Sequence, residues 1–342
     1  MIILTVKIGC VNTIDVKLDK HYMKRIIFSG IICIICFGAK AQDPTFTQFY
    51  SNPVYLNPAL AGSYGCPRIS MNYRNEWPQL TGNYVTYSAA YDTYAKSLSG
   101  GISVLALHDQ QGQGTIQTSM LGLVYSYHVK LTRKFSMMFG ARAAWFQKFL
   151  DWDKLTFGDM IDPRRGFIYQ TGDVPRGNGR RGFFDVSMGA VGFSKHFFFG
   201  GAVHHINRPD ESMILGESKL PMRFTGHLGA DIPVGGRSKY SNTTSIMPNI
   251  IYQYQNGFQE LNIGTYVKYG NFNVGAWYRN RDAFILTFGL NTGKFRLGYS
   301  YDITVSKLGN GVSGGSHEIS MGLNLRCRRK PRAFRTISCP SF

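Results

Sequence analysis

The sequence has 342 residues, and its 38 basic and 20 acidic side chains leave a formal net charge of +18. Aromatic residues make up 14% of it, chiefly 20 Tyr and 24 Phe, which suits the aromatic girdles of a membrane barrel. A strongly basic chain commonly binds nucleic acid, but the N-terminus directs export, so we expect no nucleic-acid partner. Beyond the N-terminal region no segment approaches the roughly 20 apolar residues of a spanning helix, which excludes helical membrane spans.

The N-terminal region has the pattern of a secretory signal that begins inside the sequence. Met23 precedes a Lys-Arg pair, an apolar run over 26–37 and a small-x-small site over 39–41, the three parts of a signal peptide. We predict a signal peptide over 23–41 and a mature start at Gln42. A membrane anchor is disfavoured because the run is well short of the roughly 20 residues that span a bilayer. Residues 1–22 have no place before such a signal, and we interpret them as an over-long start-codon assignment.

Residues 42–66 differ in kind from the rest of the chain. Pro44, Pro53 and Pro58 exclude a long strand ladder, and the aromatic residues between them argue against disorder. We expect a compact N-terminal segment that packs against or inside the rest of the protein. A segment on the periplasmic surface is the alternative.

Alternation of apolar with small or polar residues predicts β-strands through most of 67–325. It is clearest over 271–325 and over 121–145, where two runs flank a basic turn at 130–134. The runs have the roughly nine to eleven residues that a spanning strand needs. A soluble β-sandwich also alternates, but run length and aromatic content favour an all-β fold, a transmembrane antiparallel outer-membrane β-barrel.

The length of the mature chain limits the number of strands. At roughly ten residues a strand, plus turns and loops, it accommodates about 12 to 16 antiparallel strands. Even numbers are expected in such barrels, and we predict 14. The longest stretch without alternation, residues 150–181, is predicted to be a long extracellular loop, because the longer loops of these barrels face outward.

A basic tail, residues 326–342, follows the last predicted strand. Bacterial barrels usually keep their termini in the periplasm, so we expect the tail there, in contact with anionic lipid headgroups or an acidic partner. A solvated tail without a partner is the alternative. Its basic residues are Arg326, Arg328, Arg329, Lys330, Arg332 and Arg335.

Three cysteines persist after removal of residues 1–41, namely Cys66, Cys327 and Cys339. An odd number in an exported protein leaves one free thiol or an intermolecular bond. Cys327 and Cys339 flank the basic tail, and we predict a disulfide between them, which would stabilise the tail by roughly 3 kcal/mol. The cysteines have no zinc-binding spacing.

Residues that could carry chemistry give only weak signals. His204 and His205 end a predicted strand, where neighbouring side chains point to opposite faces and do not easily share a metal ion, so a rim or lumen position is favoured. An aspartate cluster lacks the spacing of a calcium-binding loop. The cluster comprises Asp151, Asp153, Asp159 and Asp162. Because hydrolase, metalloprotease and phosphate-loop motifs are also missing, we expect no catalytic residue, no metal and no cofactor, and hence no enzyme.

Ten short blocks follow one another along the mature chain: 42–44 (QDP), 48–53 (QFYSNP), 56–62 (LNPALAG), 72–78 (NYRNEWP), 157–159 (FGD), 184–187 (FDVS), 204–209 (HHINRP), 277–279 (WYR), 298–302 (GYSYD) and 315–320 (GSHEIS). Together they resemble the PorP/SprF family, which comprises outer-membrane proteins of the type IX secretion system of Bacteroidota. The resemblance covers the whole mature chain, and only residues 1–22 depart from it.

The resemblance implies a binding role at the outer membrane. Several family members bind, and help to secrete or anchor at the cell surface, large adhesins with a type B C-terminal domain, in gliding or adhesion. One branch is instead a machinery component that docks to the periplasmic ring, and a passive or lipid-type transport porin is a further alternative. The implied partners are such a cargo, type IX secretion components and outer-membrane lipid.

Residues in the matching blocks are candidates for contact with a partner. For Trp77 and Trp277 the structural alternative is a place in the interfacial aromatic belt. For Arg74 it is an ion pair with a carboxylate in the lumen. The candidates are Arg74, Asn75, Trp77, His204, His205, Arg208 and Trp277, and in the tail Arg328, Arg329, Lys330, Arg332 and Arg335.

Overall fold

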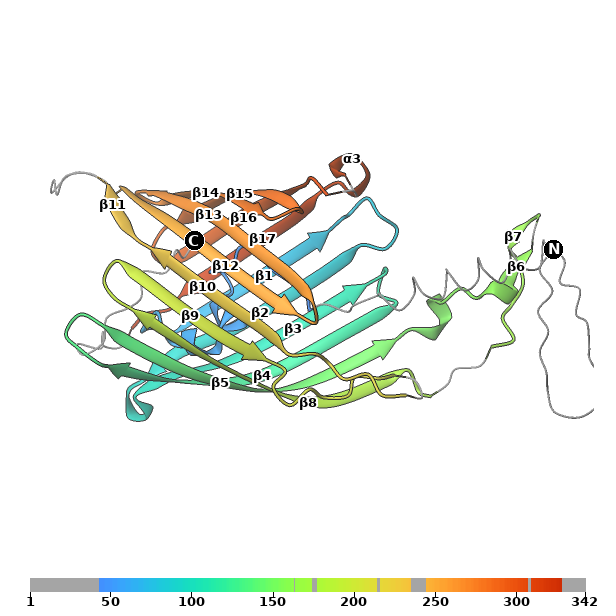
Figure 1. The fold of residues 1–342 in the computed structure, drawn as a ribbon, viewed down its shortest axis with the longest axis horizontal. Coiled ribbons are helices and arrows are strands. Elements are labelled where there is room, and N and C mark those ends of the chain that lie inside the picture. The colour runs from blue at the N-terminus through green and yellow to red at the C-terminus, as the bar shows by residue number, and fades with distance from the viewer. Residues whose placement is uncertain are drawn as a thin grey trace, which may run out of the picture. The chain divides into compact units, whose positions relative to one another are not determined.

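Fourteen of the described strands form one closed ring (Figure 1). The computed structural model describes residues 43–162, 164–173, 177–213, 216–234, 244–306 and 309–327, and within them the ring is a closed antiparallel barrel of 14 strands. The predicted fold class and strand number are therefore confirmed. Among these residues no helix is long and apolar enough to cross a membrane. The chain divides into two units, Met1–Asp43 and Pro44–Phe342, and the fold described here is that of the second.

Each strand pairs with the next along the chain, and the first pairs with the last to close the ring. A three-residue strand, β11 (Ile232–Val234), extends the edge of β12. The ring consists of β1 (Arg68–Glu76), β2 (Tyr84–Ala95), β3 (Gly100–Gln111), β4 (Ile116–Lys130), β5 (Ser136–Leu150), β8 (Arg180–Phe193), β9 (Phe197–His204), β10 (Arg223–Ala230), β12 (Thr244–Gln255), β13 (Phe258–Tyr269), β14 (Phe272–Arg279), β15 (Ala283–Asn291), β16 (Phe295–Thr304) and β17 (Ser316–Asn324).

Side chains along each strand alternate between the outer surface of the barrel and its lumen. Leu123 on β4 is 64% exposed, whereas its neighbour Val124 is 4% exposed and faces the lumen. The same alternation continues along β14 and β17. Because successive side chains of a strand point to opposite faces, the apolar residues predicted from the sequence form the outer surface, which faces lipid in a membrane barrel.

The connections between strands differ at the two ends of the barrel. At one end, the turn end, most are short, as at 131–135, 194–196, 270–271 and 292–294. At the other, the loop end, lie the connections 151–179, 205–222 and 305–315. The last of these contains the short helix α3 (Asn310–Ser313). β1 begins and β17 ends at the turn end, so both barrel termini lie there.

The longest connection, 151–179, falls within the loop predicted from the sequence, and it contains secondary structure of its own. Figure 1 shows its hairpin projecting from the barrel. The loop contains the 3-10 helices η3 (Trp152–Lys154) and η4 (Gly158–Met160) and a hairpin of β6 (Ile161–Asp162) and β7 (Gly166–Phe167). Another 3-10 helix, η2 (Lys96–Leu98), lies in a turn at the opposite end.

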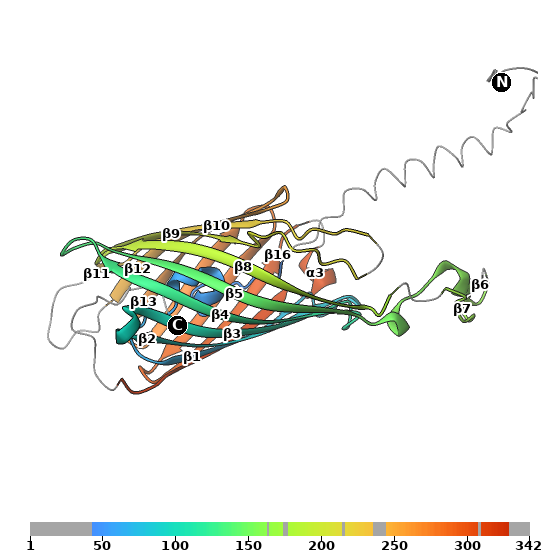
Figure 2. The same cartoon turned by 90° about the horizontal axis from the view of Figure 1, so that it is seen from below.

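Residues 44–62, here called the lumen segment, lie inside the barrel (Figure 2). The segment contains a one-turn helix, α2 (Pro53–Leu56), and the 3-10 helix η1 (Pro58–Leu60). Both begin with a proline, which suits the first turn of a helix because its missing N–H would have no partner there. All residues of 46–62 are buried, so the segment forms the centre of the barrel core.

The disulfide predicted between Cys327 and Cys339 is wrong, because Cys327 is bonded to Cys66. Cys66 precedes β1, Cys327 follows β17, and these two strands pair. The pairing continues past the strand ends, where the Leu325 N–H donates to the Pro67 carbonyl at 2.9 Å. The two Cα atoms are 5.2 Å apart, within the range for a disulfide. Spacing along the chain did not predict this disulfide, because closure of the barrel brings Cys66 and Cys327 together.

We expect thiol mapping of protein isolated from outer membranes to show this connectivity. Without reduction, alkylation should label Cys339 and leave Cys66 and Cys327 unlabelled. A protease digest should then contain a reducible peptide joining the beginning of β1 to the end of β17. Labelling of Cys66, with a linked peptide joining Cys327 to Cys339, would contradict the pairing.

Several sequence predictions lie outside the described residues. These are the upstream extension 1–22, the signal peptide 23–41 and Cys339. The basic residues Arg328, Arg329, Lys330, Arg332 and Arg335 of the tail also lie outside them.

Candidate functional site

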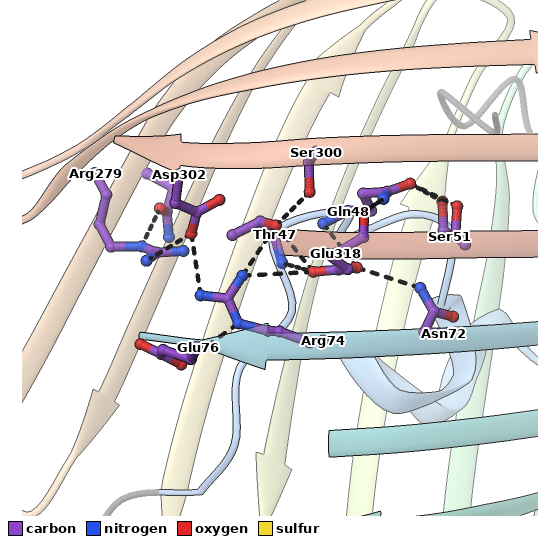
Figure 3. A network of polar contacts seen from close by, with 12 residues as sticks. Thr47, Gln48, Ser51, Asn72, Arg74, Glu76, Arg279, Ser300, Asp302 and Glu318 are labelled. Carbon is purple, nitrogen blue, oxygen red and sulfur yellow. Dashed lines mark hydrogen bonds and ion pairs between the residues drawn. The ribbon is translucent and has the colours of Figure 1, made fainter. Parts of the chain in front are cut away.

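One carboxylate of the wall holds the start of the lumen segment. Glu318 on β17 accepts the Thr47 N–H at 2.6 Å, the Thr47 hydroxyl at 2.9 Å and the Gln48 N–H at 3.3 Å. The Asn72 amide on β1 donates to the same carboxylate at 3.3 Å. Figure 3 shows these contacts converging on Glu318. Buried backbone N–H groups require partners, and Glu318 supplies them where the segment makes no ladder with a strand.

An arginine network surrounds this carboxylate. Arg74 on β1 pairs with Asp302 at 3.0 Å and Glu318 at 3.6 Å, and it donates to the Thr47 hydroxyl at 3.2 Å. Arg279 on β14 contacts the same Asp302 at 3.4 Å. The network therefore joins the lumen segment to four wall strands, β1, β14, β16 and β17, and each buried charge in it is paired, as burial requires.

Further hydrogen bonds attach the segment to the opposite wall. The Asn57 amide donates to the carbonyls of Ala190 at 3.2 Å and Gly201 at 3.0 Å, on β8 and β9. The Ser126 hydroxyl on β4 donates to the Ala59 carbonyl at 2.6 Å. Since these anchors lie on strands around the ring, the segment spans the lumen from wall to wall.

Small residues on the wall allow this close approach. A Cβ atom at Gly140, on β5, would overlap the backbone of Pro58 and Ala59 in η1. A Cβ at Gly101, on β3, would overlap the backbone of Ala61. Glycine at these two positions therefore lets segment and wall backbones touch. Between the segment and β10 and β12, the cavity next to Arg223 has a volume of about 20 Å³, room for about one water molecule.

Trp277, predicted as a contact residue or belt aromatic, faces the lumen. It is 3% exposed, and its ring lies 5.0 Å from that of Phe49 and 5.3 Å from that of Tyr266. Arg74, predicted as a contact residue or lumen ion pair, forms the ion pairs described above. Both residues thus contact the lumen segment.

The remaining candidates near β1 and β9 lie at the loop end. Asn75 is on the outward face of β1 and accepts from the Asn83 amide at 3.3 Å. Trp77 follows β1 with a φ of 55° and stacks edge-on against Tyr84. Arg208 is exposed in the connection after β9. The structure does not bring these three residues together with Trp277 in one site.

His204 and His205 do not point to opposite faces. β9 ends at His204, and His205 has a φ of 57°, so both rings are buried, with their centroids 6.5 Å apart. His205 Nδ1 lies 2.8 Å from Asp185, and Arg142 lies 3.5 Å from the same carboxylate and 3.5 Å from His204 Nδ1. The alternation rule failed here because the strand ends between the two residues.

This histidine cluster also contains a serine, but not in a catalytic arrangement. The Ser187 hydroxyl donates to Asp185 at 3.3 Å and accepts from Arg142 at 2.9 Å. In a catalytic triad the serine proton is directed to the histidine and the carboxylate orients that histidine. Here the serine proton is directed to the carboxylate, so the cluster is a buried polar network of the wall.

The principal charged residues of the lumen were missed in the sequence. Arg279, Asp302 and Glu318 lie on β14, β16 and β17 at positions opposite to the apolar series. A charge on the polar face of a spanning strand points into the lumen, and this signal was available. Their partners were not predictable, because pairing depends on register between strands.

The long loop at the loop end exposes apolar side chains outside the barrel wall. These are Ile161, Phe167, Ile168 and Tyr169, with Phe167 61% exposed. The aspartates fold the loop on itself: the Gly172 N–H donates to Asp159 at 2.8 Å, and the Arg164 N–H donates to Asp162 at 2.8 Å. These hydrogen bonds hold the pKa of each carboxyl below its usual value. Within the described chain no group of His, Cys, Asp and Glu side chains is arranged for a metal ion.

The fold is that of an outer-membrane β-barrel whose lumen contains an N-terminal segment. The family described as "Type IX secretion system membrane protein PorP/SprF" matches residues 38–323, and the chain belongs to this family. The fold and the family together place the protein in the outer membrane.

Solved structures with a similar fold are outer-membrane barrels. The toluene transporter TbuX of Ralstonia pickettii is 11% identical, with 80% of this chain and 93% of that chain covered and a TM-score of 0.45. A FadL homologue of Pseudomonas aeruginosa is 10% identical, with 84% and 100% covered and a TM-score of 0.43. Omp33 of Acinetobacter baumannii is 8% identical, with 76% and 100% covered and a TM-score of 0.40. No curated protein sequence matches the chain.

Proposed function

We propose that the protein is a binding barrel of the type IX secretion system. It holds a large secreted adhesin at the cell surface by binding the type B C-terminal domain of that adhesin. The observation that carries this proposal is the filled lumen. Residues 44–62 bond to the wall on several sides, so the conduit is occupied. The function then lies on the outside of the barrel and at its rim.

The loop end is proposed to be extracellular, because the longer connections of bacterial barrels face outward. Exposed apolar residues at 161–169 suit contact with a folded protein, since such side chains bury well in an interface. The turn end would then face the periplasm, and the basic tail after β17 would meet machinery components or anionic lipid there. Gliding or adhesion is the proposed setting.

The same observations give less support to the three alternative functions, a porin, a machinery component and an enzyme. A passive or lipid-type porin requires an open lumen, and the segment would have to leave it. A machinery component that docks to the periplasmic ring requires its partner at the turn end. An enzyme lacks support from the cluster around Asp185, where the Ser187 hydroxyl contacts the carboxylate and not a histidine. Signal-peptide export brings the chain to the membrane in every case.

A pull-down with a matched pair of variants tests the proposal. The tagged protein is isolated from outer membranes in mild detergent, and co-purifying proteins are identified by mass spectrometry. Wild type should recover a large secreted protein through its C-terminal region. A double variant with Phe167→Ser and Tyr169→Ser should lose at least tenfold of it, since apolar anchors dominate interface energies. Leu131→Ser, which removes an exposed apolar residue at the turn end, should not.

Each other outcome points away from this proposal. Recovery of periplasmic ring components alone would favour the machinery role. Equal recovery of cargo by the loop variant and by wild type would exclude the hairpin as the contact. Recovery of the barrel alone, together with ion conductance of the purified wild type in planar bilayers, would favour the porin.

A further inference from the structure

One arginine in the lumen differs from the other buried arginines. Arg296 lies on β16 near the turn end and is 4% exposed. Its guanidinium lies across Gly322 of β17, where an added Cβ would be 2.6 Å from Nη2 and 2.7 Å from Nε. The register places Gly322 between Arg296 on one side and Ser70 of β1 on the other. The guanidinium therefore extends over the glycine toward β1.

The described residues give Arg296 no hydrogen-bond acceptor and no ion pair, and its Nε is fully enclosed. The carboxylate that acts on it is Asp92, but Arg68 takes both Asp92 oxygens, at 2.8 and 3.0 Å. The Gly62 N–H also donates to Asp92, at 3.0 Å. Arg68 and Gly62 thus bind Asp92, whereas Arg296 makes no hydrogen bond to it.

The other buried arginines of the described chain all have partners. Arg74 and Arg279 pair with Asp302, and Arg142 pairs with Asp185. Arg223 donates to the Tyr55 hydroxyl at 3.1 Å. An isolated buried charge is strongly unfavourable, and a guanidinium presents donors in a fork that matches an oxyanion. Near Arg296, the Ser70 hydroxyl is also buried, at 3% exposure, and has no partner within the described residues.

We infer that Arg296 and Ser70 form a binding site for an oxyanion, a phosphate or a carboxylate, at the turn end of the lumen. The guanidinium lies over Gly322, and the register places the Ser70 hydroxyl directly across the same glycine. Arg68 adds positive charge beside Arg296. The anion supplies the acceptors that the wall lacks. It lies next to the Arg68–Asp92 pair that holds the end of the lumen segment, so its occupancy stabilises the closed lumen. This site does not depend on the cargo proposed above.

Thermal unfolding of the purified full-length protein in detergent tests the site. Inorganic phosphate, acetate and chloride are titrated separately at constant ionic strength. Phosphate or acetate should raise the Tm of wild type saturably, and chloride should not. Arg296→Gln should raise the concentration for half the shift by about tenfold or more, the equivalent of one charge-assisted hydrogen bond. Arg133→Gln, at an exposed position in a turn at the same end, is the matched control and should respond like wild type.

A second readout separates a binding role from a structural one. In buffer without oxyanions, Arg296→Gln should be at least as stable as wild type, because it removes an uncompensated buried charge. A larger shift with phosphate identifies a tetrahedral ligand, and a larger shift with acetate identifies a carboxylate. The inference is overturned if neither oxyanion shifts the Tm of wild type, if Arg296→Gln responds equally, or if this variant is destabilised without anion.

Discussion

Replacing Glu318 by alanine is expected to release the lumen segment and to cost about 3–5 kcal/mol of stability, the range for removing one partner of a buried charge network. The substitution removes the acceptor of the Thr47 and Gln48 N–H groups and leaves Arg74 with one buried carboxylate fewer. The Tm in detergent should fall by several degrees. In planar bilayers the variant should conduct, since the segment loses its attachment to β17.

Two further variants control for this result. Glu318→Gln keeps the shape and one acceptor oxygen, and it should lie between alanine and wild type. Glu76→Gln changes a carboxylate of the same network that is 25% exposed and contacts Arg74 at 3.4 Å. Because solvent screens this partly exposed carboxylate, and Arg74 keeps Asp302 and Glu318 as partners, the substitution should cost clearly less than Glu318→Ala. Wild-type stability and zero conductance of Glu318→Ala would show that Glu318 does not hold the segment.

Gly140→Val is the second substitution with a large expected effect. The new side chain would occupy the position of the Pro58 and Ala59 backbone. Overpacking a tight contact costs about 1–3 kcal/mol, and more where backbone must move. We expect η1 to be displaced from the wall and the lumen segment to become cleavable by protease in the folded barrel.

Limited proteolysis followed by mass spectrometry measures this effect. Cleavage should map within 44–62 in the variant and should be at least tenfold slower in wild type. Gly226→Ala is the control, because a Cβ on Gly226 of β10 meets no atom within 4 Å. An uncleaved segment in Gly140→Val, with an unchanged Tm, would mean that η1 does not pack tightly on β5.

Local pattern was sufficient to predict the barrel. The face of the strand that each side chain occupies follows from period-two alternation alone, so the outward position of Leu123 and the lumen position of Val124 were predictable. The number of strands came from chain length, which limited it to about 12 to 16. The proline-rich segment was also separable from the strands, because Pro53 and Pro58 cannot donate to a ladder. Which side of the wall it occupies depends on contacts with residues more than two hundred positions away, such as Glu318.

The contacts of the site residues could not be predicted from local sequence patterns. Arg74 was identified as a contact residue, but its partners Asp302 and Glu318 come from the far end of the chain and meet it only through closure of β1 on β17. The Cys66–Cys327 bond was missed for the same reason. The rule that neighbouring side chains point to opposite faces failed at His205, because a single positive φ after β9 turns its side chain toward Asp185.

The disulfide beside the closing strand pair restricts how the wall can open. β1 and β17 are the first and last strands of the ring, and backbone hydrogen bonds hold them together along their length. The disulfide links the two strands covalently at the turn end. Any lateral opening between them must therefore begin at the loop end and cannot extend past Cys66. A lipid or a partner segment could enter this seam only as a wedge from the loop end.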